Sequence, residues 1–401
     1  MAKSKEKVFC NCETLYNMYF IFNLLTICLY IIAIYAFIIK LLSGTGYIKI
    51  KYEGHDNDLT LHNAWGGMHM LKRKSKWKIC IGIFLVVLIL YTVFTYFLVS
   101  VCLVPSFMNK LEAFQKITEK SYAQQVQSSD IKKNRKVVLS ESKQWSQNAE
   151  KQKITATTLD GYTLVAQEFF PKEGCEDTNK WVILLHGYTG WKEEMYQFGY
   201  WYYNQGFHVL VPDLRAQGES EGDFIGMGWT DHIDCEQWIQ YILSQTPDAQ
   251  IVLHGQSMGA ATALMMSGDQ ASSDHVVAVI SDCAYTDAYT MFEDKIGEWF
   301  GLPAFPLEDS ACIMLQLRGG YNLKDASAIN AVKQSDIPTL FIHGDKDAMI
   351  DVAMAYELYD SATCDKELLI IEDAGHAQAQ DKNPELYYAT VSSFIGNYII
   401  E

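Results

Sequence analysis

The sequence lacks an excess of basic residues. It has 32 lysines and arginines against 48 aspartates and glutamates, which gives a net charge of −16. The imbalance lies in the C-terminal part, because residues 151–401 hold 13 basic and 38 acidic side chains, whereas residues 1–110 hold 12 basic and 5 acidic ones. An acidic part of this kind repels polyanions, so DNA and RNA are not expected partners.

The sequence also lacks the regular cysteine and histidine spacings of metal or disulfide frameworks. It contains ten cysteines but no CxxC or HxxxH pair. We therefore expect mostly free thiols, no metal site and no cofactor. Cys10 and Cys12 form a C-x-C pair that suits palmitoylation or a metal, although two unrelated cysteines explain it as well.

Two long runs contain no ionisable residue. Residues 18–39 and 79–104 are each long enough to cross a bilayer as a helix. The first run is interrupted by Asn23, and the alternative for the second is a buried core helix. We predict a transmembrane anchor at 79–104 and a possible first span at 18–39.

Charge next to the second run predicts the orientation of the anchor. Basic residues precede it at five positions, Lys72, Arg73, Lys74, Lys76 and Lys78, and follow it at three, Lys110, Lys116 and Lys120. Positive charge favours the cytoplasmic side, so everything after residue 104 is expected outside the cytoplasm, at the cell membrane. No small-x-small cleavage site follows the run, which favours an uncleaved anchor.

The segment 1–78 has two interpretations. Gly66 and Gly67 stand just ahead of Met68 and Met70, and tandem glycine codons can encode a ribosome-binding site. Translation from Met70 would leave out residues 1–69 and with them the first span. The alternative is a genuine anchor with two spans.

The part that follows the anchor, residues 105–150, is polar. Phe107, Leu111, Phe114 and Ile117 recur there at helical spacing. This pattern predicts a short amphipathic helix that leads into a stalk.

Residues 151–401 have the pattern of one large α/β domain. Asp160-Gly161 separates the runs 154–159 and 162–170, which predicts an antiparallel hairpin. Short apolar runs then alternate with helical stretches. These runs are residues 181–185, 207–211, 251–253, 276–280, 339–342 and 368–371. The alternation predicts a mostly parallel sheet with helices on both faces.

The pattern Gly255-Gln-Ser257-Met-Gly259 carries the main chemical signal. It follows the apolar run 251–253 and precedes an alanine-rich helical stretch. This is the context of a nucleophile elbow, in which glycines relieve crowding around an exposed serine at a strained turn. The alternative is a serine in an ordinary tight turn.

A nucleophilic serine needs a base and an acid that orients the base. Asp347 follows the run 339–342, and His376 follows the run 368–371. The chain order Ser257, Asp347, His376 is the order of α/β-hydrolase triads. Asp345 and Asp282 are alternative acids.

Other polar residues at the ends of the apolar runs have structural interpretations. His186, His254 and His343 each precede a glycine, and we expect them to pack and to form hydrogen bonds rather than to bind a metal. Asp213 is expected to cap the turn that follows it.

Residues 150–401 resemble α/β-hydrolases, in particular membrane-anchored serine esterases or lipase-like enzymes of bacteria. Five motifs carry the resemblance: His186-Gly-Tyr188, Asp213-Leu-Arg-Ala-Gln-Gly-Glu-Ser220, Gly255-Gln-Ser-Met-Gly259, His343-Gly-Asp-Lys-Asp347 and Gly375-His376. The sequence departs from the family at Ala216-Gln217, where Gly-His is usual.

The resemblance implies roles for individual residues. Ser257 would be the nucleophile, His376 the base and Asp347 the acid. The backbone amides of Tyr188 and Met258 would form the oxyanion hole. An aromatic-rich insertion at about 285–335 would form a lid, with its aromatic residues either lining an acyl pocket or packing between helices.

The expected function is a membrane-anchored serine hydrolase that cleaves a carboxylic ester through an acyl-enzyme. Two alternatives stay open. One is an amidase or peptidase with the same triad, and the other is a non-catalytic binding module on this fold. The expected partners are a small-molecule substrate and the membrane, and the sequence does not determine the oligomeric state.

Overall fold

The computed structural model describes residues 61–108, 128–175, 178–269 and 274–400. The chain divides into two compact units, Met1–Phe94 and Thr95–Glu401. The second unit contains the sheet and all the candidate catalytic residues.

The second unit is built on an eight-stranded sheet in the order β1-β2-β4-β3-β5-β6-β7-β8. The strands are β1 (Lys151–Thr157), β2 (Thr163–Phe169), β3 (Lys180–Leu185), β4 (His208–Pro212), β5 (Gln250–Gln256), β6 (Val276–Asp282), β7 (Thr339–Gly344) and β8 (Lys366–Ile371). β2 is antiparallel to β1 and β4, and the other neighbours are parallel. The predicted hairpin and the mostly parallel sheet are both present. The turn between β1 and β2 uses Gly161 at a φ of +93°, where a side chain would be strained.

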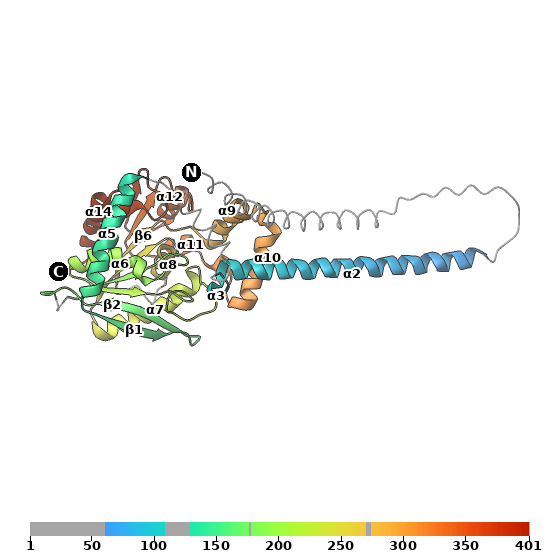
Figure 1. Ribbon diagram of the computed structural model, residues 1–401, viewed down its shortest axis with the longest axis horizontal. Helices are drawn as coiled ribbons and strands as arrows, with labels where there is room; N and C mark the ends of the chain where they lie inside the picture. Colours follow the sequence, from blue (N-terminus) through green and yellow to red (C-terminus); the bar gives the residue numbers. More distant parts are fainter. Residues whose placement is uncertain (1–60, 109–127, 176–177, 270–273, 401) are drawn as a thin grey trace, which may run out of the picture. The chain divides into compact units, whose positions relative to one another are not determined.

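Helices cover both faces of the sheet (Figure 1). One layer holds α5 (Ser129–Asn148), α6 (Tyr196–Asn204), α13 (Ala379–Lys382) and α14 (Pro384–Gly396), and the other holds α7 (Trp229–Gln245), α8 (Met258–Ser267), α11 (Ala328–Val332) and α12 (Val352–Ser361). The central strands are buried on both faces, which explains their continuous apolar runs. The remaining short elements are η1 (Lys192–Met195) and η2 (Leu323–Asp325).

The predicted anchor at 79–104 corresponds to the end of a long helix, α2 (Leu61–Leu103). Its part Cys80–Leu103 is long and apolar enough to cross a membrane, by length and composition. The basic residues 72–78 lie in the same helix, just ahead of this part. The possible first span at 18–39 lies outside the described residues. The possible start at Met70 concerns residues 1–69, most of which lie outside them too.

The predicted stalk at 105–150 differs from the structure where the structure describes it. A short helix, α3 (Pro105–Met108), follows α2, and residues 109–127 lie outside the description. α5 packs against α6 and α13 and does not stand apart from the domain. Its Trp145 is buried and stacks on Phe169 of β2, with ring centroids 4.3 Å apart. Residues 129–148 are therefore part of the second unit.

The predicted lid region at about 285–335 contains α9 (Ala288–Phe300) and α10 (Ala304–Gly319), followed by η2 and α11. Asp287 caps α9 by accepting a hydrogen bond from the amide of Thr290. The two longer helices connect β6 to β7 near the edge of the sheet where the strands end.

Candidate active site

Ser257 lies at a strained turn between β5 and α8. Its φ is +57° and its ψ is −119°, a conformation that side chains rarely adopt. The turn depends on both glycines of the elbow. A Cβ at Gly255 would lie 2.1 Å from the carbonyl oxygen of Gly259, and one at Gly259 would lie 2.0 Å from that of Leu185. The chain therefore has the local geometry that presents a serine hydroxyl at the end of a strand.

The structure brings Ser257, His376 and Asp347 into one hydrogen-bonded row. His376 Nε2 lies 2.8 Å from Ser257 Oγ, and His376 Nδ1 lies 2.7 Å from Asp347 Oδ2. His376 and Asp347 are buried, and they come from the loops after β8 and β7. This arrangement lets the imidazole accept the serine proton while the carboxylate stabilises the resulting cation.

The Asp347 carboxylate is held by several donors. The amides of Met349 and Ile350 donate to its Oδ1 at 2.8 and 2.9 Å. Burial opposes the charged form, but His376 and His343 outweigh burial and hold the pKa of Asp347 far below its usual value. The group therefore stays ionised as an orienting acid requires.

The two alternative acids make other contacts. Asp345 accepts from the amide of Asp373 at 2.6 Å and pairs with Lys346. Asp282 accepts from Tyr387 and Gln256, each at 3.2 Å, and burial raises its pKa to about 6. The geometry favours Asp347 over both.

The two candidate oxyanion donors lie on either side of the serine. Met258 is the first residue of α8, where backbone amides have no acceptor within the helix. Tyr188 follows Gly187, and a Cβ at Gly187 would lie 3.5 Å from Ser257 Cβ. The loop after β3 thus runs beside the serine, as an oxyanion loop does.

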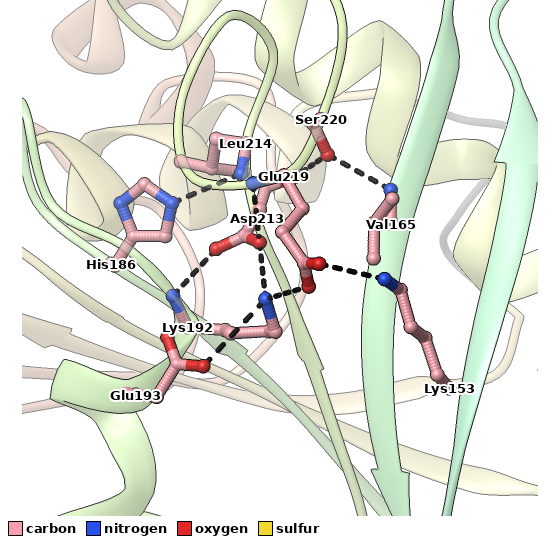
Figure 2. Close-up of polar contacts among 9 residues, drawn as sticks. All are labelled: Lys153, Val165, His186, Lys192, Glu193, Asp213, Leu214, Glu219 and Ser220. Carbon is pink, nitrogen blue, oxygen red and sulfur yellow. Dashed lines mark hydrogen bonds and ion pairs between the residues drawn. The ribbon is translucent and has the colours of Figure 1, made fainter.

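An ionic cluster around the buried Lys192 and Asp213 supports this loop (Figure 2). Asp213 accepts hydrogen bonds from the amide of Lys192 at 2.7 Å and from its ammonium at 2.6 Å, while Glu219 bonds the same ammonium at 2.7 Å. Burial opposes the charge of Lys192, but the two carboxylates outweigh it and raise the pKa of the lysine. Asp213 also accepts from the amide of Glu219, as the predicted turn cap would. Its main contact is the lysine, which sequence reasoning missed.

The three histidines at the strand ends have hydrogen-bonding roles. His186 accepts from the amide of Leu214 at 3.0 Å, and burial lowers its pKa to about 4. His254 lies between two tyrosine hydroxyls, and burial lowers its pKa to about 3. His343 donates to the carbonyl of Ile350 at 2.9 Å and faces Asp347 at 3.2 Å.

One group of possible metal ligands occurs within the part of the chain that the structure describes. It consists of Cys283, Asp347 and His376, whose ligand atoms lie within 4.8 Å of one another. Both nitrogens of His376 already face Asp347 and Ser257. Burial raises the pKa of the Cys283 thiol, which disfavours the thiolate that a metal would need. Asp347 and His376 therefore fit the row with Ser257 better than a metal site.

The departure at Ala216-Gln217 has a structural consequence. Ala216 has a φ of +62°, a conformation that glycine adopts without strain, which explains why the family usually has glycine there. The loop bonds to β2 through Ser220 and Glu221. With alanine and glutamine at positions 216 and 217, His376 Nε2 lies 2.8 Å from Ser257 Oγ.

Aromatic residues of the predicted lid pack into the domain. Tyr285 and Tyr321 are buried, and their hydroxyls donate to the carbonyls of Met227 and Ile225. For these two residues the structure favours helix packing over an aromatic pocket.

A cavity of about 210 Å³ lies beside the loop that carries Asp347. Met291, Met349 and Met354 supply apolar lining, and Lys295 is the basic residue of its wall. Unbranched, polarizable methionine side chains adapt to ligands of varied shape.

Arg135 of α5 contacts the loop that carries the candidate base. It donates to Asp381 at 2.7 Å and to the carbonyl of Ala377, the residue after His376, at 3.1 Å. Asn134 donates to the carbonyl of Asp381 at 2.9 Å. No sequence pattern points to this contact, since the partners are more than 240 residues apart.

Comparison with known proteins agrees with this architecture. Residues 180–311 match the family model of the α/β-hydrolase fold. YqkD of Bacillus subtilis (strain 168), whose own function is uncharacterised, is 30% identical over 222 residues, which are 55% of this chain and 72% of YqkD. YfhR of Escherichia coli O157:H7, also uncharacterised, is 27% identical over 217 residues, which are 53% of this chain and 69% of YfhR.

Solved structures extend the comparison to the fold. The esterase Pf2001 of Pyrococcus furiosus superimposes with a TM-score of 0.51 at 22% identity, over 64% of this chain and 94% of the esterase. At this identity the likeness concerns the fold alone. The match to the family model and the 30% identity to YqkD show that the chain belongs to the α/β-hydrolase fold family.

Proposed function

We propose that the protein is a membrane-anchored serine hydrolase that cleaves a carboxylic ester. The observation that carries the proposal is the row from Ser257 Oγ through His376 to Asp347, with distances of 2.8 and 2.7 Å. The strained elbow and the buried, ionised Asp347 support it. A module that only binds has no need for this combination.

Ser257, His376 and Asp347 would carry out the reaction in two steps. Ser257 Oγ attacks the ester carbonyl carbon and passes its proton to His376 Nε2, while the amides of Tyr188 and Met258 stabilise the negative oxygen. The imidazolium then protonates the leaving alcohol, which leaves an acyl-Ser257. Water attacks the acyl-enzyme with His376 as base, which releases the acid and restores the serine.

An ester suits the site better than an amide because an alkoxide is a better leaving group than an amide anion and demands less of the general acid. The fold neighbour from Pyrococcus furiosus is named an esterase, which agrees with this choice. Amide or peptide cleavage by the same row is the second candidate within enzymes.

The proposed anchor is the segment Cys80–Leu103. Its support is its length, its composition and the five basic residues just before it, which favour a catalytic unit outside the cytoplasm.

The test uses the full chain in detergent micelles and a p-nitrophenyl ester series from acetyl to palmitoyl. We expect turnover that is lost in Ser257→Ala and kept in Ser244→Ala, since Ser244 is an exposed serine on α7. Covalent labelling by a fluorophosphonate should follow the same pattern. Turnover or labelling that survives Ser257→Ala would overturn the mechanism. A folded protein that is neither labelled nor active on esters or anilides would favour the binding module.

A further inference from the structure

The last turns of α2 are part of the second unit. Residues 95–103 lie in that unit by their contacts, and most of their side chains are buried in it. The buried ones are Thr95, Leu98, Val99, Ser100, Val101, Cys102 and Leu103. The last residues of the proposed anchor are therefore packed into the second unit.

Two hydrogen bonds bring this helix end close to the catalytic serine. The hydroxyl of Tyr188 donates to the carbonyl of Cys102, and the amide of Ile225 donates to that of Leu103 at 2.9 Å. Carbonyls in the last turn of a helix have no partner within the helix and need such donors. Because Tyr188 is also the candidate oxyanion residue, the serine lies near the end of α2.

α10 is tied to the same helix end through Arg318. Its guanidinium donates to the carbonyl of Tyr96 at 3.2 Å and to the hydroxyl of Ser100 at 2.9 Å. It also stacks over the Tyr96 ring, 3.8 Å from the centroid. Figure 1 shows α10 beside these last turns of α2.

The solvent-facing side of α10 carries two large apolar side chains close to Arg318, beside the exposed Gln316. Ile313 and Leu317, one helical turn apart, are 63% and 78% exposed. The opposite side of the helix, with Leu307, Cys312 and Leu315, is buried in the domain. We call Ile313, Leu317 and Arg318 the α10 face.

Charge also distinguishes this segment. Residues 310–320 contain no acidic residue and one arginine, whereas the surrounding residues 151–401 carry 38 acidic side chains. Anionic lipids repel acidic surfaces and attract basic ones, so a segment with one arginine and no acidic residue suits a bilayer surface.

The depth of the helix end agrees with contact to a bilayer. A hydrocarbon core needs about 20 helical residues, so a span that begins at residue 79 ends near residue 98. Tyr96 and Ser100 then lie at the level of the lipid headgroups. Arg318 binds both residues, so its guanidinium would lie at the level of the headgroups. The neighbouring Leu317 would lie at the same level.

We propose that the α10 face rests on the lipid bilayer and that Ser257 takes its ester from a lipid carried in that bilayer. The proposal rests on the proposed anchoring and serine chemistry and adds the substrate class to them. A bilayer is the surface that this face would meet, because Arg318 bonds directly to the last turns of the proposed span.

The contact is tested in vesicles of phosphatidylethanolamine and phosphatidylglycerol that hold the full chain. A photoreactive p-benzoylphenylalanine replaces Leu317 in one sample and Leu386 in the other. Leu386 is a matched control because it is an exposed leucine on α14. We expect lipid adducts at position 317 and few at 386, by mass spectrometry. Equal yields at both positions would overturn the docking surface, whether or not the protein is active.

The substrate class is tested with the double variant Ile313→Glu/Leu317→Glu and the control Leu386→Glu. Loss of apolar contact should reduce hydrolysis of a fluorogenic diacylglycerophospholipid in the vesicles by about tenfold. Hydrolysis of soluble p-nitrophenyl butyrate should stay near wild type. If the double variant hydrolyses both substrates at wild-type rates, or if Leu386→Glu loses as much phospholipid hydrolysis as the double variant, the lipid substrate is overturned. The serine hydrolase would stand in either case. If the wild type cleaves neither ester and its serine is not labelled, the proposed function fails and the lipid substrate with it.

Discussion

Replacing Arg135 by methionine tests whether α5 supports the catalytic unit. The guanidinium bonds Asp381, whose side chain is fully buried and whose second oxygen has no hydrogen bond among the described residues. Methionine keeps the apolar stem and the helix propensity but leaves this carboxylate without its cation. Breaking a wholly buried pair costs about 3–5 kcal/mol. Since 44% of the Arg135 side chain is exposed, we expect about 2 kcal/mol of lost unfolding free energy.

The loss should depend on pH. Burial raises the pKa of Asp381, and Arg135 works against that increase, so the pKa rises further in Arg135→Met. A raised carboxyl pKa means that the folded state favours the protonated form, so the charged form costs stability above that pKa. The destabilisation should therefore be largest near neutral pH and shrink as pH falls through the raised pKa, where the neutral acid no longer needs the arginine.

The measurement is urea unfolding of the full chain in micelles at several pH values, with Lys136→Met as control. Lys136 is an exposed lysine on the same helix, and it should change the midpoint little. The bond from Arg135 to the carbonyl of Ala377 also fixes the loop after His376. We therefore expect a several-fold lower kcat with little change in KM. Equal midpoints for the two variants at neutral pH, or a loss independent of pH, would refute this reasoning.

Two further pairs of variants test the site. Asp347→Asn should lower kcat by about 10³- to 10⁴-fold, because an amide cannot stabilise the imidazolium, whereas Asp345→Asn should stay near wild type; comparable losses in ester assays would contradict the choice of acid. Lys192→Met should destabilise the fold by about 3 kcal/mol, because it leaves the Asp213 carboxylate buried without its cation. Lys153→Met, which removes an exposed partner of the same cluster, should cost about 0.5 kcal/mol in the same unfolding assay.

The strands and the elbow could be predicted because their signals are local. Each central strand is an apolar run bounded by polar residues, and the elbow pattern lies between a strand and a helix. Ser257, Asp347 and His376 follow β5, β7 and β8, and parallel strands bring their carboxyl ends to one edge of the sheet. The meeting of the three side chains was therefore expected from topology alone.

The choice between Asp345 and Asp347 depends on loop geometry that spacing does not contain. The amides of Met349 and Ile350 donate to one oxygen of the Asp347 carboxylate, and the other oxygen bonds His376. Asp345 instead turns to the amide of Asp373. In advance, only the resemblance to the family favoured the later residue.

The role of α5 could not be predicted, because its contacts are distant in sequence and its composition is polar. The helix buries only a few side chains, chiefly Ile131 and Trp145, so its periodicity resembles that of a solvated stalk. Its place in the domain is fixed by Trp145 on Phe169 and by Arg135 on Asp381. Both contacts depend on surfaces that exist only once the sheet and α13 have formed.

The end of α2 shows a different limit of sequence patterns. Hydropathy treats residues 79–104 as one uniform segment, because lipid-facing and protein-buried side chains are equally apolar. The structure assigns residues 95–103 to the catalytic unit, with Cys102 bonded to Tyr188 and Ser100 to Arg318. The same helix that would hold the protein in a membrane thus also completes the packing around the candidate oxyanion loop and α10. The boundary between the apolar segment and the second unit therefore depends on side-chain contacts that hydropathy does not contain.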